Sequence, residues 1–471
     1  MTAPRRRLAA VVTLCALALG CRDDSLGVGG PAPTLDAVSV AANPHNVLSA
    51  VLAVRVRGAD SVAAHVRAPD DPTVADAATP AVLVAGNSAQ ILVLGLLAQR
   101  RYLLRVVAYG AGTTSAGGPL EFTTGELPPD LPRYVASGPD PTPGYVVFAA
   151  GRYGLAIDNT GRVAWYRAFP NGPGLAFMAQ PTGRYFARPP PALPTDPAPW
   201  VELDPAGDVT RTIGCARGLS PRVHDIVAQT DGTYWLMCDE TRVVDLSGVG
   251  GVRDARVTGT AVQRVSADGA LLFDWSPFER FAITDSPLRD RAGASVNWTH
   301  GNALDLAPDG NLIVSFRNLG EVTKIDAVTG AVIWRLGGRR SDFTFSGDAG
   351  APFVAQHGAR VAAPATVLLL DNLGTHGESR AERYALDERA MTARLVRSYS
   401  AAPSVVTEIG GSVQDLPRGH TLVSFGTAGR VEEYDAAGRV VWRIEHNAGY
   451  VFRAQRVRSL YAPGSAAHFS R

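Results

Sequence analysis

Neither sign of charge dominates this sequence. Its 45 basic and 44 acidic residues leave a net charge of +1 over 471 residues, and basic residues do not cluster beyond the N-terminus. A nucleic-acid-binding surface needs a patch of positive charge. The composition therefore gives no support for a nucleic acid partner.

Long apolar segments are also scarce. One run, residues 8–19, follows Arg5, Arg6 and Arg7; it is too short for a membrane span and has the length of a secretory signal. The run ends in Ala-Leu-Gly-Cys21, which resembles a bacterial lipoprotein cleavage box with Cys21 as the lipidated residue. A plain signal peptide cut nearby is the alternative. We expect residues 1–21 to be the signal, 22–32 a tether, and the protein to be exported, periplasmic or anchored by lipid to the outer membrane of a Gram-negative bacterium.

Cysteine is rare, with four residues in all. Cys15 would leave with the signal and Cys21 would carry lipid, so that Cys215 and Cys238 remain, either as a disulfide in an oxidising compartment or as two buried thiols. The sequence has no Cys-x-x-Cys or His-x-x-x-His spacing. We therefore expect no metal site and no cofactor.

Turn-forming residues, in contrast, are abundant. The 49 glycines and 33 prolines are scattered without a period, which favours an all-β protein with many turns. Short alternating segments at 52–56, 81–84, 90–94, 102–108 and 120–123 predict a β-sandwich over residues 33–126. The run around Tyr102 resembles the end of a fibronectin type III domain, with Tyr102 as its corner tyrosine.

A repeat follows a stiff linker at 127–132. A turn glycine precedes an apolar strand, and an Asp, a Gly and a Trp follow later in the unit, with the Trp at positions 165, 334 and 442. Six such four-stranded units fill residues 133–471 and predict a six-bladed β-propeller, in which these tryptophans pack between blades. The segment 326–334 is, by itself, also similar to the repeat of quinoprotein propellers.

Polar residues recur in one phase of this repeat. His224, Asn302 and His357 each stand eight residues before the turn position, and His300 lies two residues before Asn302. Because the first strand of each blade lines the central channel, this phase aims all four side chains at one axis. Arg317 and Asn318 follow the next strand, at an end where a β scaffold presents side chains to ligands. A polar channel lined by solvated histidines is the alternative.

An ordered series of motifs resembles the bacterial arylsulfate sulfotransferase family. The motifs are Trp298-Thr-His-Gly-Asn, Ser315-Phe-Arg-Asn-Leu-Gly-Glu-Val-Thr-Lys-Ile-Asp, Trp334-Arg-Leu-Gly-Gly, Phe353-Val-Ala-Gln-His-Gly-Ala-Arg, Leu370-Asp-Asn and Ser379-Arg-Ala-Glu-Arg-Tyr. The resemblance implies a periplasmic six-bladed propeller that moves a sulfuryl group from a phenolic sulfate donor to a phenolic acceptor, without a nucleotide sulfate.

The same resemblance implies catalytic roles for His300, His357 and Arg380. A sulfate ester must be held by cations, and a base must take the phenolic proton of the acceptor. Arginine suits the first task through its planar fork. Histidine, with an unperturbed pKa of about 6.5, suits the second. Further residues expected to contact substrate are Asn302, Arg317, Asn318, Gln356, Asn372, Arg430 and His224.

The last blade departs from the family pattern. The family carries its sulfated histidine shortly after a strand that ends in Phe-Gly, whereas the corresponding position here is near Arg430. Three hypotheses remain: another histidine (His357, His300, His376 or His224) takes the sulfuryl group, transfer is direct, or the protein binds an aryl or sulfate anion without turnover. A quinoprotein dehydrogenase is a third functional class. His420 and His446 lie in or beside turns and are expected to be exposed.

Overall fold

The computed structural model describes residues 31–194, 196–287, 290–348, 352–362 and 365–464. Within these ranges the secondary structure consists of β-strands and single-turn 3-10 helices, so the all-β prediction is confirmed. The 3-10 helices are η1 (Ser247–Val249), η2 (Pro277–Glu279), η3 (Ile283–Asp285), η5 (Arg317–Leu319), η6 (Pro417–Gly419) and η7 (Gly426–Ala428). The predicted signal, Cys21 and most of the tether lie outside the described residues. No helix in the described ranges has the length and apolar character needed to cross a membrane.

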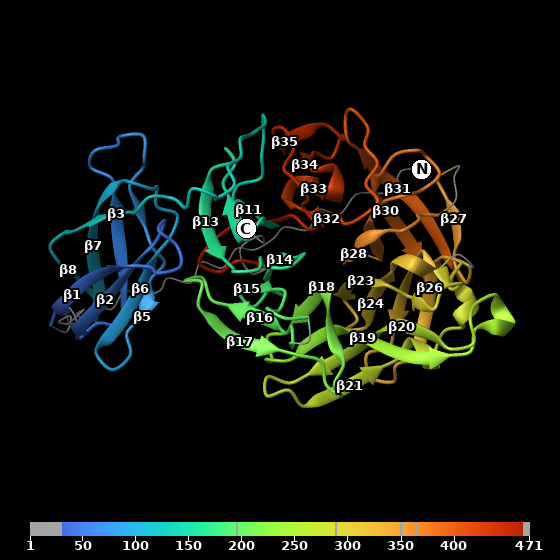
Figure 1. The fold of residues 1–471 in the computed structure, drawn as a ribbon. Helices are drawn as coiled ribbons and strands as arrows, with labels where there is room; N and C mark the ends of the chain where they lie inside the picture. Colours follow the sequence, from blue (N-terminus) through green and yellow to red (C-terminus); the bar gives the residue numbers. More distant parts are fainter. Residues whose placement is uncertain (1–30, 195, 288–289, 349–351, 363–364, 465–471) are drawn as a thin grey trace, which may run out of the picture.

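Residues 34–123 form two sheets that share one apolar core (Figure 1). One sheet contains β1 (Thr34–Ala42), β2 (Ala50–Arg57) and β6 (Ser88–Val93). The other contains β3 (Ser61–Arg67), β4 (Ala77–Ala78), β5 (Val82–Leu83), β7 (Arg101–Gly110), β8 (Thr113–Ala116) and β9 (Leu120–Thr123). Alternate residues of β2 are buried, as a strand with one face on a core requires. The hydroxyl of Tyr102 accepts a 2.7 Å hydrogen bond from the amide of Leu97.

Six further sheets follow in the described residues from 136 onward (Figure 1). Three of them consist of consecutive strands. The first contains β14 (Phe177–Gln180), β15 (Arg184–Ala187), β16 (Trp200–Leu203) and β17 (Val209–Ile213). The second contains β18 (Ser220–Ala228), β19 (Tyr234–Val244), β20 (Ala255–Val265) and β21 (Leu271–Trp275), with β22 (Ser295–Asn297) beside β20, and the third contains β23 (Gly301–Leu306), β24 (Leu312–Phe316), β25 (Glu321–Ile325) and β26 (Val332–Gly337). A fourth has β28 (His357–Ala362), β29 (Thr366–Asp371), β30 (Arg380–Asp387), β31 (Thr392–Ser400) and β27 (Thr344–Ser346).

The other two sheets combine strands from both ends of this region. The C-terminal β36 (Gln455–Val457) pairs with β11 (Tyr145–Ala150), which continues to β12 (Tyr153–Ile157) and β13 (Val163–Ala168). The early β10 (Ala136–Ser137) pairs with β35 (Val440–Ile444) at the edge of a sheet that holds β32 (Ser412–Asp415), β33 (Thr421–Ser424) and β34 (Val431–Tyr434). These pairings close the set of sheets on itself. The sequence repeat did not predict this exchange, because it depends on pairing between segments about 300 residues apart.

The innermost strand of each of these six sheets lies at a common centre. Residues of β14, β18, β23, β28, β32 and β36 all line one cavity of about 310 Å³. Side chains on these inner strands accept hydrogen bonds from the backbone of the neighbouring inner strand at five of the six junctions. The bonds run from Ala228 to Gln180, Leu304 to Asp225, Val361 to Asp305, Arg456 to Gln414 and Ala179 to Gln455.

Buried tryptophans connect neighbouring sheets farther from the centre. The indole N–H of Trp165 donates to the carbonyl of Pro205 at 2.9 Å, that of Trp275 to Gly330 at 3.1 Å, and that of Trp442 to Asn159 at 2.9 Å. In each case the Trp reaches a turn of the next sheet. Trp334 is also buried, so the tryptophans of the repeat lie between sheets and hold them together.

Candidate functional site

Three histidine rings meet at one end of the inner strands. His224 lies on β18, His300 directly before β23, and His357 begins β28. The rings of His224 and His300 have centroids 5.1 Å apart, and Phe452 lies 5.6 Å from His224 and 6.1 Å from His357. We call His224, His300 and His357 the histidine cluster. The structure thus brings together the three histidines that share one phase of the repeat.

The backbone at His300 is held in an unusual conformation. His300 has a φ of 49°, in the left-handed region that costs energy for a residue with a side chain. Thr260 holds this turn on both sides, because its hydroxyl accepts from the amide of Gly301 and its amide donates to the hydroxyl of Thr299, both at 2.8 Å. A Cβ at Gly301 would lie 2.5 Å from the Thr260 side chain. The Thr-His-Gly sequence is therefore required locally to present the imidazole.

His300 carries its proton on Nε2. Its Nδ1 lies 2.7 Å from the side-chain nitrogen of Asn297, which can only donate, so Nδ1 is the acceptor. Burial lowers the pKa of His300 to about 3, with further lowering by the positive charges of Arg222 and Arg317. The ring is therefore neutral at pH 7 and presents an N–H donor at Nε2.

His357 has the opposite tautomer. Its Nδ1 lies 2.8 Å from the Asn372 side-chain oxygen and 3.1 Å from the carbonyl of Ala355, and both of these atoms only accept. The Asn372 amide is fixed in this orientation because its nitrogen donates to Thr407 and Gly410, each at 2.9 Å. Nδ1 of His357 must carry the proton, which leaves the Nε2 lone pair for a ligand. Burial lowers the pKa of His357 to about 4, partly opposed by the Asn372 hydrogen bond.

His224 completes the cluster as a buried neutral ring. Burial lowers its pKa well below the ordinary value, and the charge of Arg222 lowers it further. All three rings thus have a pKa below the ordinary histidine value, because a charged imidazole is disfavoured where water is excluded and arginines are near.

Two arginines act on His300 from different elements. Arg317 in η5 donates to the Asn318 side chain at 3.1 Å and to the carbonyl of Glu408 at 3.2 Å. The Asn318 amide in turn donates to the carbonyl of Asn297 at 2.6 Å. Arg222 lies on β18 and was absent from the sequence prediction, although it stands two residues before His224, a spacing that places both on one face of an extended strand.

Arg380 does not contact the cluster within the described residues. Its guanidinium binds Asp348 at 2.8 Å and also Glu382, whose other oxygen accepts from Tyr384. Arg380 lies on β30, the third strand from the centre, and both of its carboxylate partners bind its Nη2. The predicted grouping of Arg380 with His300 and His357 is therefore not what the structure shows.

Arg430 repeats this arrangement one sheet further on. It binds Glu432, which also accepts from Tyr434, next to β34, again the third strand from the centre. We call the two sets Arg380–Glu382–Tyr384 and Arg430–Glu432–Tyr434 the outer triplets. In both sets the glutamate binds the arginine with one oxygen and the tyrosine with the other.

Asn302 and Gln356 lie below the histidines as buried connectors. The Asn302 amide donates to the carbonyl of Gln356 at 2.6 Å, and the Gln356 amide donates to the Ser315 hydroxyl at 3.0 Å and the Glu321 carbonyl at 2.9 Å. Both side chains are completely buried. They join β23, β25 and the start of β28, so the structure gives them a positioning role and no direct opening to a ligand.

A buried ion network separates the cluster from the axial cavity. Asp225 binds Arg453 at 2.6 and 2.9 Å and Arg360 at 2.8 Å. Asp225 follows His224 directly, and the cavity lining begins there and at Gly358, one residue beyond His357. Removing one partner of a buried ion pair is strongly destabilising, so this network holds Asp225, and with it the neighbouring His224, in a fixed position.

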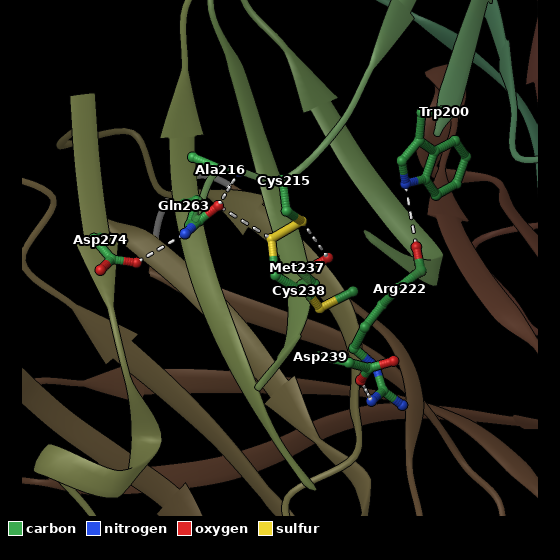
Figure 2. Close-up of a disulfide and its surroundings, with 9 residues drawn as sticks. All are labelled: Trp200, Cys215, Ala216, Arg222, Met237, Cys238, Asp239, Gln263 and Asp274. Carbon is green, nitrogen blue, oxygen red and sulfur yellow. Dashed lines mark hydrogen bonds and ion pairs between the residues drawn. A yellow bond between two sulfur atoms is a disulfide. The ribbon is translucent and has the colours of Figure 1, made fainter. Parts of the chain in front are cut away.

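Cys215 and Cys238 form a disulfide beside the cluster (Figure 2). The bond joins the segment after β17 to Cys238 on β19. Asp239, the residue after Cys238, pairs with Arg222. Elsewhere, His420 proves to be buried, with its Nδ1 2.7 Å from Glu433, so the expectation that it is exposed is wrong; His446 is exposed. Within the described ranges no group of three or more His, Cys, Asp or Glu side chains is arranged to hold a metal ion.

Residues 219–447 match the family described as arylsulfotransferase (ASST). No curated protein matches the chain. Among solved structures, a protein of unknown function from Bacteroides caccae is 12% identical, with 68% of this chain and 100% of that chain covered at a TM-score of 0.42. A streptogramin B lyase is 11% identical (66% and 82% covered, TM-score 0.38), and a chain of a nidogen/laminin complex is 14% identical (66% and 97%, TM-score 0.39). At these TM-scores the likenesses carry no argument about fold or activity.

Proposed function

We propose that this chain, which belongs to the arylsulfotransferase family over residues 219–447, moves a sulfuryl group from a phenolic sulfate ester to a phenolic acceptor at the histidine cluster. The observation that carries this proposal is the pair of opposite tautomers at His300 and His357. One ring offers an N–H donor and its neighbour offers a lone pair. Sulfuryl transfer needs one group of each kind.

The two rings have distinct tasks in this scheme. The Nε2–H of His300 donates a hydrogen bond to the bridging oxygen as negative charge develops on the departing phenolate. In direct transfer, the Nε2 of His357 takes the proton of the acceptor phenol as the acceptor oxygen displaces the donor phenolate from sulfur. In double displacement, Nε2 attacks sulfur as the S–O bond to the donor phenolate breaks; the acceptor oxygen then displaces Nε2 from sulfur, and the phenolic proton passes to the released phenolate or to solvent. The task of His357 requires a neutral ring at pH 7, and its lowered pKa of about 4 supplies one; His300, with its pKa lowered to about 3, donates from Nε2 as a neutral ring.

The route of transfer is decided by whether His357 is sulfated. The position where the family carries its sulfated histidine is near Arg430 here, and that guanidinium is paired with Glu432. We propose His357 as the nucleophile, since its Nε2 lone pair is the one its hydrogen bonds leave for a ligand. Intact-protein and peptide mass spectrometry after exposure to donor alone would locate a sulfuryl adduct. Turnover with no adduct at any histidine would instead establish direct transfer.

Activity is tested with 4-nitrophenyl sulfate as donor and phenol as acceptor. We expect release of nitrophenolate that depends on added phenol, together with formation of phenyl sulfate. Release that does not depend on the acceptor would indicate a sulfatase. Absence of turnover across a panel of aryl sulfates and phenols would overturn the proposal.

A non-catalytic aryl-anion-binding protein is the second candidate, and the arginine in place of the last-blade histidine favours it. This candidate predicts that 4-nitrophenyl sulfate binds without release of nitrophenolate, and that binding is lost in Arg317→Ala. Under both candidates the ligand is a phenolic sulfate, and no nucleic acid or cofactor is involved.

The surrounding architecture is part of the same proposal. We interpret the six sheets of the described residues from 136 onward as the blades of a six-bladed β-propeller over residues 133–471 and residues 33–126 as a fibronectin type III-like sandwich. Residues 1–21 are proposed to direct export and to provide the lipid anchor at Cys21. Metabolic labelling with a radioactive fatty acid, compared with a Cys21→Ser variant, tests the anchor.

A further inference from the structure

Arg222 is anchored against the backbone next to His300. Its Nε donates to the carbonyl of Gly301 at 3.0 Å, and its Nη1 binds Asp239. Its own carbonyl accepts from the indole N–H of Trp200 at 3.1 Å. Both the backbone and the side chain of Arg222 are therefore fixed, with the guanidinium beside the residue that follows His300.

The free edge of this guanidinium faces no described partner. The bonds of Arg222 use Nε and Nη1, and no described residue engages Nη2. The charge of Arg222 acts on the rings of both His224 and His300. A planar guanidinium with donors left over beside a neutral N–H donor is the arrangement that holds the oxygens of a sulfate ester.

Asp239 compensates the charge of Arg222 only in part. The Arg222 side chain is 7% exposed, whereas that of Asp239 is 38% exposed. A carboxylate that reaches solvent is stabilised by water as well as by its partner, so that it holds the guanidinium in place without cancelling its field at the histidines.

The strand that carries Arg222 lacks regular pairing at this point. The β18–β19 ladder pairs Ser220 with Asp239 and Pro221 with Cys238, and its regular pairing resumes only at Ile226. Arg222 and His224 therefore lie in a stretch that the ladder does not fix. Three contacts replace it: the Trp200 hydrogen bond, the Asp239 ion pair and the Cys215–Cys238 disulfide (Figure 2).

The disulfide connects the segment that leads into this stretch with the neighbouring strand β19. Cys238 directly precedes Asp239 on β19, and Cys215 precedes the short loop that leads into β18. The bond thus joins the strand that holds Asp239 to the segment that delivers Arg222. Because the distance between guanidinium and carboxylate depends on both strands, the covalent link fixes the position of the guanidinium.

We propose that Arg222 binds the non-bridging oxygens of the sulfate ester, and that Asp239 and the Cys215–Cys238 disulfide are positioning elements that act through it. This assignment rests on the proposed sulfuryl transfer and names the cation that grips the donor. It replaces Arg380, whose guanidinium is held by Asp348 and Glu382.

The first test compares Arg222→Gln and Arg222→Lys with Arg217→Gln. Arg217 lies in the loop before β18, two residues after Cys215, and pairs with Asp274 of β21, so it serves as the matched control. For Arg222→Gln we expect the KM for 4-nitrophenyl sulfate to rise about 10-fold and kcat/KM to fall about 100-fold, since a charge-assisted contact to the donor is lost. Arg222→Lys should recover part of the loss. Kinetics of Arg222→Gln equal to those of Arg217→Gln would overturn the assignment.

The second test is a double-mutant cycle. Asp239→Asn, and separately the pair Cys215→Ser and Cys238→Ser, should raise the donor KM about 3- to 10-fold in wild type, yet change it less than 2-fold when added to Arg222→Gln. A purely structural role would give effects that add. Circular dichroism and the melting temperature identify variants that fail to fold, and Asp239→Asn carries the test if the serine pair does so.

Binding measurements separate this inference from the proposed reaction. Calorimetry with 4-nitrophenyl sulfate should show Arg222→Gln at least 10-fold weaker than wild type, whether or not turnover occurs. Turnover by wild type with unchanged binding in Arg222→Gln would sink the assignment alone. Neither turnover nor binding in wild type would sink both.

Discussion

Arginine has opposite roles in the outer triplets and at the histidine cluster. Arg380 begins the third strand from the centre of its sheet and Arg430 directly precedes that of the next sheet, and each binds a glutamate two residues later that also accepts from a tyrosine. Arg222 and Arg317 lie near the inner strand ends, where their charges act on neutral imidazoles. The arginines of the outer triplets bind glutamates, whereas at the cluster the Nη2 of Arg222 meets no partner among the described residues.

The histidine cluster and His420 differ in the partners that their rings contact. His420 is paired with Glu433 inside a network that includes Arg456, and this network joins the last sheet to the segment around Thr142. His357 meets an amide oxygen and a carbonyl instead, which fix its tautomer without supplying charge. The hydrogen bonds of His357 fix its tautomer and leave Nε2 without a hydrogen-bond partner among the described residues, whereas the contacts of His420 place it in a buried ion network.

The largest effect that would sharpen this contrast is expected for His357→Ala. Loss of the base or nucleophile should lower kcat for nitrophenyl sulfate by about 1,000-fold, within the range for such groups. His446→Ala, at an exposed turn, is the matched control and should stay within 2-fold of wild type. Similar kinetics for the two variants would show that the cluster is not the reaction site.

A smaller loss of activity is expected when one of the two hydrogen bonds that fix the tautomer of His357 is removed. Asn372→Ala removes the nearer of the two acceptors that hold the proton on Nδ1 and leaves only the carbonyl of Ala355, so kcat should fall about 30-fold while the ring remains. The hydrogen bond that His357 donates to Asn372 raises the pKa of His357, and its loss should lower that pKa further. The acid limb of the kcat profile should therefore move to lower pH. An unchanged limb would argue that Asn372 only fills space.

The pH dependence of the wild type tests the neutral rings directly. With His357 near a pKa of about 4, kcat should be level from about pH 5 to 8 and fall about 10-fold per pH unit below about 4, as its lone pair becomes protonated. The free energy of unfolding should also decrease at low pH. Unfolded histidine has a pKa of about 6.5, so the unfolded state binds more protons, and the free energy of unfolding should decrease as pH falls from about 6.5 toward 4. An acid limb centred near pH 6.5 would contradict this account.

Arg380→Met should separate stability from activity. The change leaves the buried Glu382 without its cation, which should cost about 3 kcal/mol in the free energy of unfolding. Activity per folded molecule should change less than 3-fold, because the guanidinium does not reach the cluster. Urea unfolding and kcat/KM measured on the same preparation check both parts. A 100-fold loss of kcat/KM with normal stability would restore Arg380 as an anion-binding residue.

The smallest effect is expected for Arg430→Lys. Lysine retains the charge opposite Glu432, and the site is partly exposed, so stability should change by about 1 kcal/mol or less and activity by less than 2-fold. A large change in donor KM would mean that Arg430 does serve the anion.

The sequence alone determined the strands, the repeat and the phase that aims His224, His300 and His357 at one centre. These features depend on alternation and turn signals within about ten residues, where local geometry limits the choice. Strands within residues 33–126 were likewise predicted from their alternation, although β1 and β3 were missed because their burial patterns are irregular.

Only the tertiary structure decided which side chains remain available. Asn372 orients His357 through carbonyls 35 and 38 residues away, Arg453 reaches Asp225 across 228 residues, and Asp348 holds Arg380 from 32 residues away. Residue type and strand phase do not encode such partners. Whether a buried imidazole or guanidinium is already bound or open to a ligand depends on the groups that folding brings within about 3 Å of it, and many of those groups lie far away in the sequence.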